Sequence, residues 1–495
     1  MNSFKNYING KWTDAESGKT FKNINPADRD DIIGTFPDSG KSDVEAATKA
    51  AKDAYKEWKR LPAPRRGDII RKAGDIFTRR KNELAKIMTR EMGKPVFETE
   101  GDVQEAIDTA YYAATEARRL FGFNAPSEMY NKMNMSFRVP IGVCGIITAW
   151  NFPIAVPSWK ILPALICGNT VVFKPSEEAP HSGVIFAEIL EEAGLPAGVF
   201  NVVHGAKDVG EAMIEQDDIR VIGFTGSTDV GKKIASRCGE LNKKVSLEMG
   251  GKNAQIVMDD ANLELALEGV LWGAFGTTGQ RCTATSRLIL HEKIYDEFIN
   301  MLITKATALK LGPGLEESTQ VGPVITEKQL KRVEYYVRVG RDEGALCVLG
   351  GDRADEGKLA NGNFWKPTIF IDVLPTMRIF QEEIFGPVLS VSKATSFEEA
   401  IDMVNDSPYG LSSSIYTADV NQAFAAIRDI EAGITYINSP TIGAEAHMPF
   451  GGVKGTGNGH REGGWTVYDI FTEWKTVYVD YSNRLQRAQI DTELA

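Results

Sequence analysis

The feature that most constrains the fold of this chain is a regular alternation of short apolar runs and helical segments, which begins near Val139. Runs rich in β-branched residues predict strands, and the segments between them show the apolar spacing of amphipathic helices. Strands joined by helices are typical of a parallel sheet with helices on both faces. The sequence therefore predicts a doubly wound α/β fold. Strands are expected at 141–148, 170–173, 199–203, 221–224 and 245–247, with helices at 181–193, 207–216 and 228–239.

The same alternation starts again after Gly250 and Gly251 and predicts a second α/β lobe. A chain of 495 residues has room for two or three domains of ~100–200 residues, which agrees with this division. Three helices are expected ahead of the first lobe, at 42–58, 65–92 and 98–120. In the second lobe we expect helices at 262–276, 292–309, 327–344, 397–405 and 420–430, and strands at 286–290, 367–371, 411–416 and 434–438.

Two segments outside both lobes, 131–139 and 476–480, predict edge strands. The unpaired backbone groups of an edge strand can pair with another chain. We therefore expect these strands to take part in oligomerisation.

Charge and cysteine content narrow the class of partner. With 56 basic and 67 acidic residues the net charge is −11, which gives no electrostatic basis for binding a phosphate backbone, and we expect no nucleic acid partner. The five cysteines are odd in number and include no CxxC pair, so the sequence predicts neither a disulfide framework nor a metal site. This cysteine usage fits a cytoplasmic location.

The uncharged stretch 139–159 resembles a membrane span in length. Three prolines interrupt it, and Asn151 lies near its middle. Because proline breaks a helix interior, we interpret the stretch as a buried strand, a loop and a short helix, and expect no membrane partner.

Residues suited to a dinucleotide follow two of the predicted strands. No GxGxxG motif is present, but the strand at 221–224 leads into a small-residue turn around Gly226 and then a helix, whose first amides can receive a phosphate. Lys174 and Glu177 follow the strand at 170–173. A carboxylate there can accept hydrogen bonds from both ribose hydroxyls and would repel a 2′-phosphate, which favours NAD over NADP. A plain strand-turn-helix connection and a solvated ion pair are the alternatives.

Cys282 is the cysteine best placed for chemistry. It lies in a Gly- and Thr-rich loop beside Arg281, whose charge we expect to lower the pKa of the thiol, whereas two other cysteines lie in apolar runs. Glu248 ends a strand next to two glycines and suits a general base, and Asn151 follows another strand and suits an oxyanion. The alternatives are an inert thiol, an ion-paired strand end and a turn residue.

Seven short motifs follow one another along the chain. They are WNFP (150–153), FKPSE (173–177), FTGS (224–227), LEMGGK (247–252), GQRC (279–282), EEIFGPV (382–388) and PFGG (449–452). In this order and spacing, over about residues 5–480, they resemble the NAD(P)-dependent aldehyde dehydrogenase superfamily.

The resemblance implies a nucleophile at Cys282, a general base at Glu248 for the deacylating water, and an oxyanion hole made by Asn151 with the Cys282 amide. Lys160 and Glu473 match positions that the family associates with a proton path to the base. The other implied residues would contact the cofactor, which is NAD or alternatively NADP: Trp150, Lys174, Glu177, Phe224, Gly226, Ser227, Val230, Glu383 and Phe385.

The resemblance also implies a domain plan. Residues 1–127 and 142–249 would form a Rossmann-like NAD-binding domain, and 250–450 a second α/β catalytic domain. Residues 128–141 and 470–495 would form a small β oligomerisation flap, in a homodimer or homotetramer acting on a small-molecule aldehyde.

Two local features bear on the substrate. The loop at 439–448 resembles that of relatives acting on carboxylated semialdehydes, although the sequence after it departs from the aminoadipate type. Arg281 would suit a substrate carboxylate, and contacts are also expected at Gln104 and Glu445. A general aliphatic or aromatic aldehyde dehydrogenase is the alternative within the family. A thiol hydrolase and a non-catalytic structural relative are the alternatives from other classes.

Overall fold

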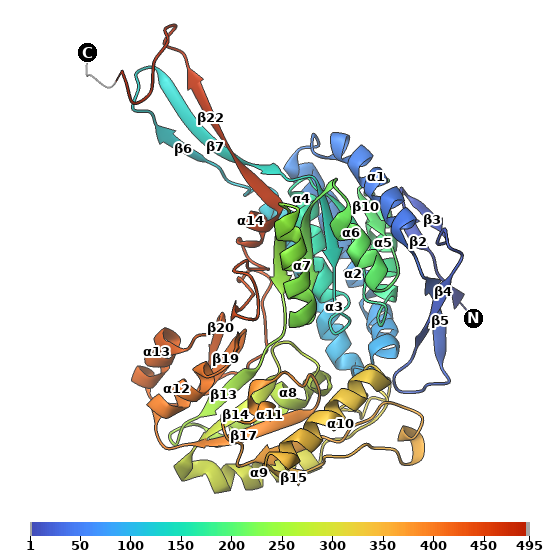
Figure 1. The fold of residues 1–495 in the computed structure, drawn as a ribbon, viewed down its shortest axis with the longest axis vertical. Helices are drawn as coiled ribbons and strands as arrows, with labels where there is room; N and C mark the ends of the chain where they lie inside the picture. Colours follow the sequence, from blue (N-terminus) through green and yellow to red (C-terminus); the bar gives the residue numbers. More distant parts are fainter. Residues whose placement is uncertain (1, 492–495) are drawn as a thin grey trace.

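The computed structural model describes residues 2–491, and its two largest sheets each contain seven strands (Figure 1). Residue 1 and residues 492–495, the end of the predicted tail, lie outside the described residues. One large sheet is built from the first half of the chain and the other from the second half. The α/β prediction with two parallel-strand lobes is confirmed.

The first sheet consists of β2 (Asn6–Ile8), β3 (Lys11–Thr13), β8 (Val143–Ile147), β9 (Thr170–Lys174), β10 (Phe200–Val202), β11 (Ile219–Thr225) and β12 (Lys244–Glu248). Its order is β12-β11-β8-β9-β10-β2-β3, and the strands from β12 to β10 run parallel. Helices α1 (Lys41–Trp58), α6 (Lys207–Glu215) and α7 (Thr228–Glu240) cover one face. The other face carries α2 (Ala63–Met92), α3 (Val96–Glu116), α4 (Ala155–Ile166) and α5 (His181–Glu192). Because both faces are covered, the central strands β8, β9 and β11 are mostly apolar.

The second sheet consists of β13 (Asn253–Val257), β14 (Thr285–His291), β15 (Leu346–Leu349), β16 (Thr368–Ile371), β17 (Val388–Ala394), β19 (Ser412–Tyr416) and β20 (Ile434–Ile437). Its order is β15-β16-β17-β14-β13-β19-β20, and β15 alone runs antiparallel to its neighbour. Helices α8 (Leu263–Phe275) and α9 (Tyr295–Thr307) pack on one face. The opposite face carries α10 (Glu327–Asp342), α11 (Arg378–Gln381), α12 (Phe397–Asn405) and α13 (Val420–Asp429).

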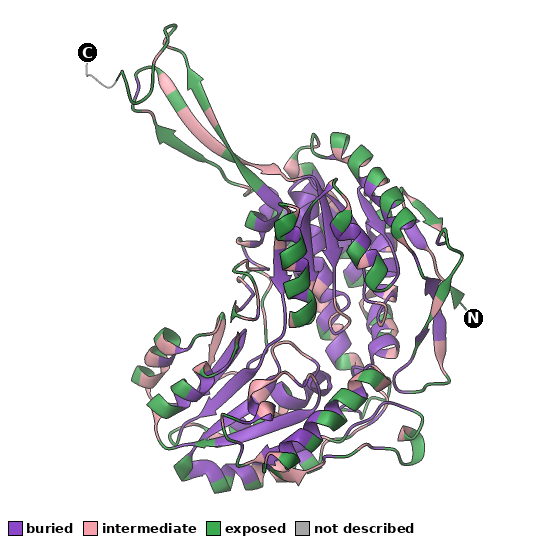
Figure 2. Cartoon of the chain, viewed as in Figure 1, coloured by how far each residue is buried: buried purple, intermediate pink, exposed green. Residues whose placement is uncertain are grey.

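A third, antiparallel sheet projects away from both lobes (Figure 1). It has the order β22-β7-β6, from β22 (Thr472–Asp480), β7 (Lys132–Pro140) and β6 (Phe123–Pro126). Its side chains are mostly exposed or half-buried (Figure 2). We call these three strands the flap. β6 lies within the range 1–127 that the resemblance assigns to the NAD-binding domain.

The remaining elements are short. They are β1 (Asn2–Ser3), β4 (Thr20–Ile24) and β5 (Ile32–Pro37) in one sheet, β18 (Tyr409–Gly410) paired with β21 (Val453–Lys454), α14 (Val467–Phe471), and 3-10 turns at Gly276–Gly279, Glu292–Ile294 and Gly357–Leu359.

The uncharged stretch 139–159 forms the end of β7, the buried strand β8, a loop and the start of α4, as its prolines predict. Among the helices of residues 2–491, none combines the length and apolar character needed to cross a membrane.

Candidate active site

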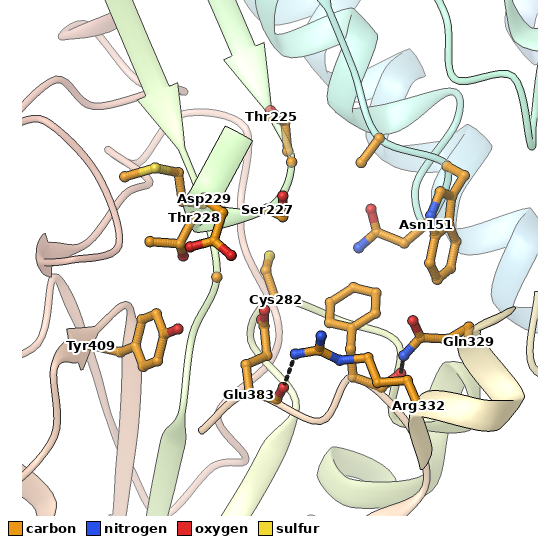
Figure 3. Close-up of a pocket in the computed structure, with 16 residues that line it drawn as sticks. Asn151, Thr225, Ser227, Thr228, Asp229, Cys282, Gln329, Arg332, Glu383 and Tyr409 are labelled. Carbon is orange, nitrogen blue, oxygen red and sulfur yellow. Dashed lines mark hydrogen bonds between the residues drawn. The ribbon is translucent and has the colours of Figure 1, made fainter. Parts of the chain in front are cut away.

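The largest group of predicted site residues meets between the two lobes. The carboxyl ends of β8, β11 and β12 face loops that lead into β14 and β17, and together they line a cavity of about 270 Å³. Ligands of open α/β sheets bind at such carboxyl ends. The lining residues are Ala149, Trp150, Asn151, Thr225–Asp229, Met249, Gly250, Cys282, Gln329, Arg332, Glu383, Phe385 and Tyr409 (Figure 3).

Asn151 reaches the cavity because β8 ends just before it. Its side chain is buried, and in Figure 3 the Asn151 amide and Cys282 both point into the cavity from different elements. The neighbouring Trp150 ring meets the Phe385 ring edge to face, with centroids 5.4 Å apart. The loop after β8 thus presents an amide donor to the space beside the thiol.

Cys282 lies on the loop that enters β14, and its backbone is held from β13. Asn253 donates through Nδ2 to the carbonyl of Cys282 at 2.8 Å and to that of Ala284 at 2.9 Å. Burial, together with the charges of Glu248 and Glu383, raises the pKa of Cys282 to about 12, although backbone N–H groups of the loop oppose the shift. The resting group is therefore a thiol.

The expectation that Arg281 lowers the pKa of this thiol is wrong. The Arg281 guanidinium turns away and binds Glu98 on α3, with Nη2 2.7 Å from Oε2. Burial therefore dominates at Cys282, and a proton acceptor is needed before the sulfur can attack.

Glu248, the last residue of β12, supplies a carboxyl close to that thiol. Burial raises its pKa to about 8, and the charges of Lys160 and Arg461 reduce the shift. Within the described part of the chain, no group hydrogen-bonds to Oε1 of Glu248. Gly451 approaches so closely that a Cβ there would lie 2.7 Å from this oxygen. A buried carboxyl with a free oxygen and a pKa near the working range suits a general base.

Lys160 is buried on α4 and forms an ion pair with the buried Glu462. Burial lowers the pKa of Lys160 to about 7, opposed by the charge of Glu248.

The prediction that Glu473 shares this path with Lys160 is wrong: Glu473 is exposed on β22, opposite Val139 of β7. Sequence reasoning missed Glu462, and its only signal was a carboxylate directly after Arg461 in a glycine-rich segment.

The cofactor-side residues predicted in the turn after β11 line the same cavity. Gly226 and Ser227 form the turn, and α7 begins at Thr228. Oγ1 of Thr225 is buried and, among the residues that the structure describes, has no hydrogen-bond partner. An exposed helix start and an unpaired hydroxyl give this wall of the cavity polar groups for an anionic ligand.

Glu383 and Phe385 form the opposite wall. Phe385 has a φ of 62°, and two side chains of α10 hold this backbone: Gln329 donates to the Phe385 carbonyl at 2.8 Å, and Arg332 donates to the Glu383 carbonyl at 2.6 Å. The Glu383 carboxylate accepts the amide of Gly251 at 2.9 Å. Sequence reasoning missed Gln329 and Arg332, because nothing in a helix 50 residues upstream marks its contact with this loop.

Four predicted cofactor residues lie outside the lining of this cavity. Lys174 ends β9 and donates to Glu177 at 3.2 Å, and Thr148 of the neighbouring strand end binds the Lys174 carbonyl at 3.3 Å. The Glu177 side chain is 42% exposed, and Val230 is exposed on α7. Phe224 is buried on β11, with its ring against Gly226 and Gly231. Lys174, Glu177 and Val230 therefore lie at the carboxyl edge of the first sheet, outside the cavity that contains the thiol.

The three predicted substrate residues are not brought together. Arg281 binds Glu98, and Gln104 accepts from Lys81 at 2.9 Å and donates to Asp108 at 2.9 Å. Glu445 is exposed and lies 3.4 Å from His447. Of the two orientations considered for Arg281, the structure shows the one in which a protein carboxylate pairs with the guanidinium.

Comparison with known proteins adds to this geometry. The family model described as "Aldehyde dehydrogenase family" matches residues 12–477. An alpha-ketoglutaric semialdehyde dehydrogenase of Bacillus subtilis is 42% identical over 480 residues, covering 97% of this chain and 98% of its own. An alpha-ketoglutarate semialdehyde dehydrogenase of Haloferax volcanii is also 42% identical, over 96% of this chain and 99% of its own.

A solved structure gives the same agreement in three dimensions. Betaine aldehyde dehydrogenase of Staphylococcus aureus in complex with NAD+ superposes with a TM-score of 0.95 at 33% identity, covering 98% of this chain and 99% of that chain. Fold and sequence similarity therefore extend over nearly the whole chain.

Proposed function

Because the chain belongs to the aldehyde dehydrogenase family, we propose that it oxidises a semialdehyde bearing a carboxylate to the corresponding diacid, with NAD+ as the oxidant. The observation that carries the proposal is the cavity into which the Asn151 amide and Cys282 both point, next to Glu248. A nucleophile and an oxyanion donor in one cavity, with a base close to the nucleophile, are the parts that acyl transfer through a thioester needs.

The residues present fit a nicotinamide dinucleotide. The unpaired Thr225 hydroxyl, the start of α7 and the Glu383 carboxylate line one cavity with the thiol. Gly250 allows the Glu383 carboxylate to lie close, since a Cβ there would be 2.6 Å from Oε2. Ser227 and Thr225 would hold phosphate, and Glu383 would hold a ribose. When bound, the nicotinamide accepts hydride from the carbon attached to Cys282.

In the first half of the reaction, Sγ of Cys282 bonds to the aldehyde carbon. The thiol proton must leave first, because burial keeps the pKa of Cys282 high, and Glu248 is the carboxylate placed to receive it. The carbonyl oxygen becomes an oxyanion, which the Asn151 amide and the backbone N–H of Cys282 stabilise. After oxidation the carbon remains on Cys282 as a thioester.

In the second half, Glu248 removes a proton from water, and the water oxygen bonds to the thioester carbon. The bond from carbon to Sγ then breaks, which releases the carboxylic acid and regenerates Cys282. The Lys160–Glu462 ion pair lies close enough for the charge of Lys160 to act on Glu248, and the pair can accept the proton that Glu248 must lose before it acts as a base again. Glu248 serves as the base only when ionised.

The choice of substrate class rests on the relatives named for alpha-ketoglutarate semialdehyde, a substrate that carries a carboxylate. The choice of NAD+ rests on Glu177, which extends the carboxyl edge of the first sheet and would repel a 2′-phosphate. A general aldehyde dehydrogenase is the second candidate, since Arg281, the cation next to the nucleophile, is already paired with Glu98.

We also propose that the chain assembles as a homodimer or homotetramer through the flap. β22 and β6 are its edge strands, and apolar side chains such as Tyr478, Val479 and Phe123 are exposed on them. Open edges with exposed apolar side chains pair readily with a second chain.

The test is NADH formation, followed by absorbance, with four- and five-carbon semialdehyde acids and uncharged aldehydes of equal length. We expect the acids to give the higher kcat/KM, and NAD+ to be preferred to NADP+. Glu177→Ala should narrow the preference for NAD+, because the variant loses the ribose contact and the repulsion of a 2′-phosphate. Preference for neutral aldehydes would select the second candidate, and no oxidation of any aldehyde would overturn the proposal.

A further inference from the structure

Two of the buried carboxylates of helix α3, Glu98 and Asp102, lie outside the cavity lining and point toward the two loops of the candidate site. They are one helical turn apart, so their side chains project from the same face. Both carboxylates have a side-chain exposure of 0%. Charges buried this deeply cost free energy unless each is fully paired, so their partners identify what they hold.

Glu98 holds the turn that precedes the nucleophile. Its Oε1 accepts the amide of Thr277 at 2.9 Å, and its Oε2 accepts the Thr277 hydroxyl and Nη2 of Arg281, the latter at 2.7 Å. Arg281 also donates through Nε to the Thr277 hydroxyl at 2.8 Å.

The turn held by Glu98 is strained. Thr277 and Thr278 have φ values of 52° and 56°, a left-handed conformation that is unfavourable for a residue with a Cβ. Within the turn, Thr278 donates to the Gly322 carbonyl, and Gln280 bonds to backbone groups of Thr277, Pro323 and Ile325. Glu98 supplies the bonds that tie this turn to α3.

Asp102 holds the loop that carries the oxyanion donor. Its Oδ1 accepts the amide of Ala155, the first residue of α4, at 2.7 Å. Its Oδ2 accepts Nζ of Lys94 at 2.8 Å, and that ammonium lies 3.7 Å from the centre of the Phe152 ring. Phe152 directly follows Asn151, so Asp102 fixes the chain on the far side of the oxyanion donor.

We propose that Glu98 and Asp102 are positioning residues that set the placement of the Cys282 thiol relative to the Asn151 amide. The nucleophile comes from the second lobe and the oxyanion donor from the first, and α3 contacts both loops through one rigid turn of helix. This inference rests on the proposed function, because it assigns the two loops their roles in acyl transfer.

The charges of this group balance, which explains why carboxylates are used. Glu98 pairs with Arg281, whose side chain is 12% exposed, and Asp102 pairs with the buried Lys94. A neutral side chain at either position removes the charge partner of a cation. Arg281 belongs to the thiol loop itself, whereas Lys94 contacts the oxyanion loop through the Phe152 ring. The ion pair between Glu98 and Arg281 thereby links α3 to the loop that carries Cys282.

The test compares Glu98→Gln and Asp102→Asn with a matched control on the same helix, Asp108→Asn. Asp108 is exposed and accepts one bond, from Gln104. Two rates are measured without cofactor. One is the burst of nitrophenolate from a p-nitrophenyl ester, which requires both the thiol and the oxyanion donor. The other is the alkylation of Cys282 by iodoacetamide, which requires the thiol alone.

For Asp102→Asn, we expect the ester burst to slow by roughly tenfold or more, with alkylation within about twofold of the parent, because only the oxyanion donor moves. For Glu98→Gln, both rates should change, because the thiol loop moves. The control should match the parent in both.

Parental ester bursts in both variants would overturn the proposal, even if their melting temperatures fall, because a merely structural role lowers stability without changing the ratio of the two rates. Equal slowing of both rates in Asp102→Asn would also contradict it. If the parent acylates on the ester but forms no NADH from any aldehyde, the proposed function fails while the positioning of the two loops is still measured.

Discussion

At the scale of single residues, the burial of the Glu248 carboxyl affects both the stability of the fold and the pH dependence of catalysis. Burial raises its pKa in the folded protein to about 8, whereas in the unfolded chain a glutamate ionises near ~4.3. The folded state therefore binds this proton more tightly. Its contribution to stability is complete below the unfolded pKa and is lost as the pH rises through about 8.

Glu248→Gln removes this titration, so the melting temperature of the variant relative to the parent should rise between pH 5 and pH 9. We expect the gap to widen by roughly 3 °C or more, measured by differential scanning fluorimetry in matched buffers. Over the same range the parent's steady-state kcat should increase as Glu248 ionises. A gap that does not change with pH would show that this carboxyl is not buried in its neutral form.

Arg281 gives a second residue-scale prediction. Glu98 already neutralises its guanidinium, so Arg281→Met should lower kcat/KM for a semialdehyde acid and for its uncharged analogue by similar factors, within about threefold of each other. The two substrates are compared in the parent and the variant under identical conditions. A loss in kcat/KM of about tenfold or more that is confined to the semialdehyde acid would mean that Arg281 binds the substrate carboxylate.

Residue type and place along the chain were enough to propose Cys282, Glu248 and Asn151 as catalytic candidates, because Asn151 follows a strand, Cys282 precedes one and Glu248 ends one. The directions of long side chains could not be predicted in this way. Arg281 turns to Glu98 and Lys160 turns to Glu462, each partner lying on a distant segment that only the folded chain brings close. The strained turn at Thr277 has no sequence signature, because threonine rarely adopts that conformation.

At the scale of elements, strands buried on both faces were the easiest to predict, since they are apolar runs between helices. β13 and β17 escaped prediction because polar residues interrupt their pattern. In β17, Ser390 and Ser392 are buried by donating to the carbonyls of Ile379 and Val373, a pairing that the sequence does not reveal. The strands β2 and β3, with three residues each, are too short to show a period.

The flap gives the prediction that belongs to this scale. Replacing exposed residues of the edge strand β22, Tyr478→Glu with Val479→Glu, should dissociate the assembly, because buried charges would face the partner's strand. Mass is measured by light scattering after size-exclusion chromatography. Leu315→Glu, an exposed leucine outside the flap, is the control. An unchanged mass for the double variant would place the interface elsewhere.

At the scale of the whole molecule, the candidate active site is built from both lobes. Asn151, Glu248 and the turn at Gly226 come from the first lobe, and Cys282 and Glu383 come from the second. A ligand in this cavity therefore contacts both lobes.

Saturating NAD+ should stabilise the two lobes together. At about one hundred times the dissociation constant the gain is ~2.7 kcal/mol, so calorimetry should show one transition that moves upward as a unit. Two transitions, of which NAD+ shifts only one, would show that the cofactor binds a single lobe and that the cavity is not shared.

The central claim is that Cys282 carries the acyl group and that Glu248 activates the water that removes it. The most direct measurement is a rapid-mixing experiment on Glu248→Gln with NAD+ and a semialdehyde acid, followed by intact-mass and peptide analysis. We predict a burst of about one NADH per subunit, then a stall, with the acyl mass found on the peptide containing Cys282. Sustained turnover at the parental rate, or a stalled enzyme that carries no acyl group on Cys282, would contradict the claim.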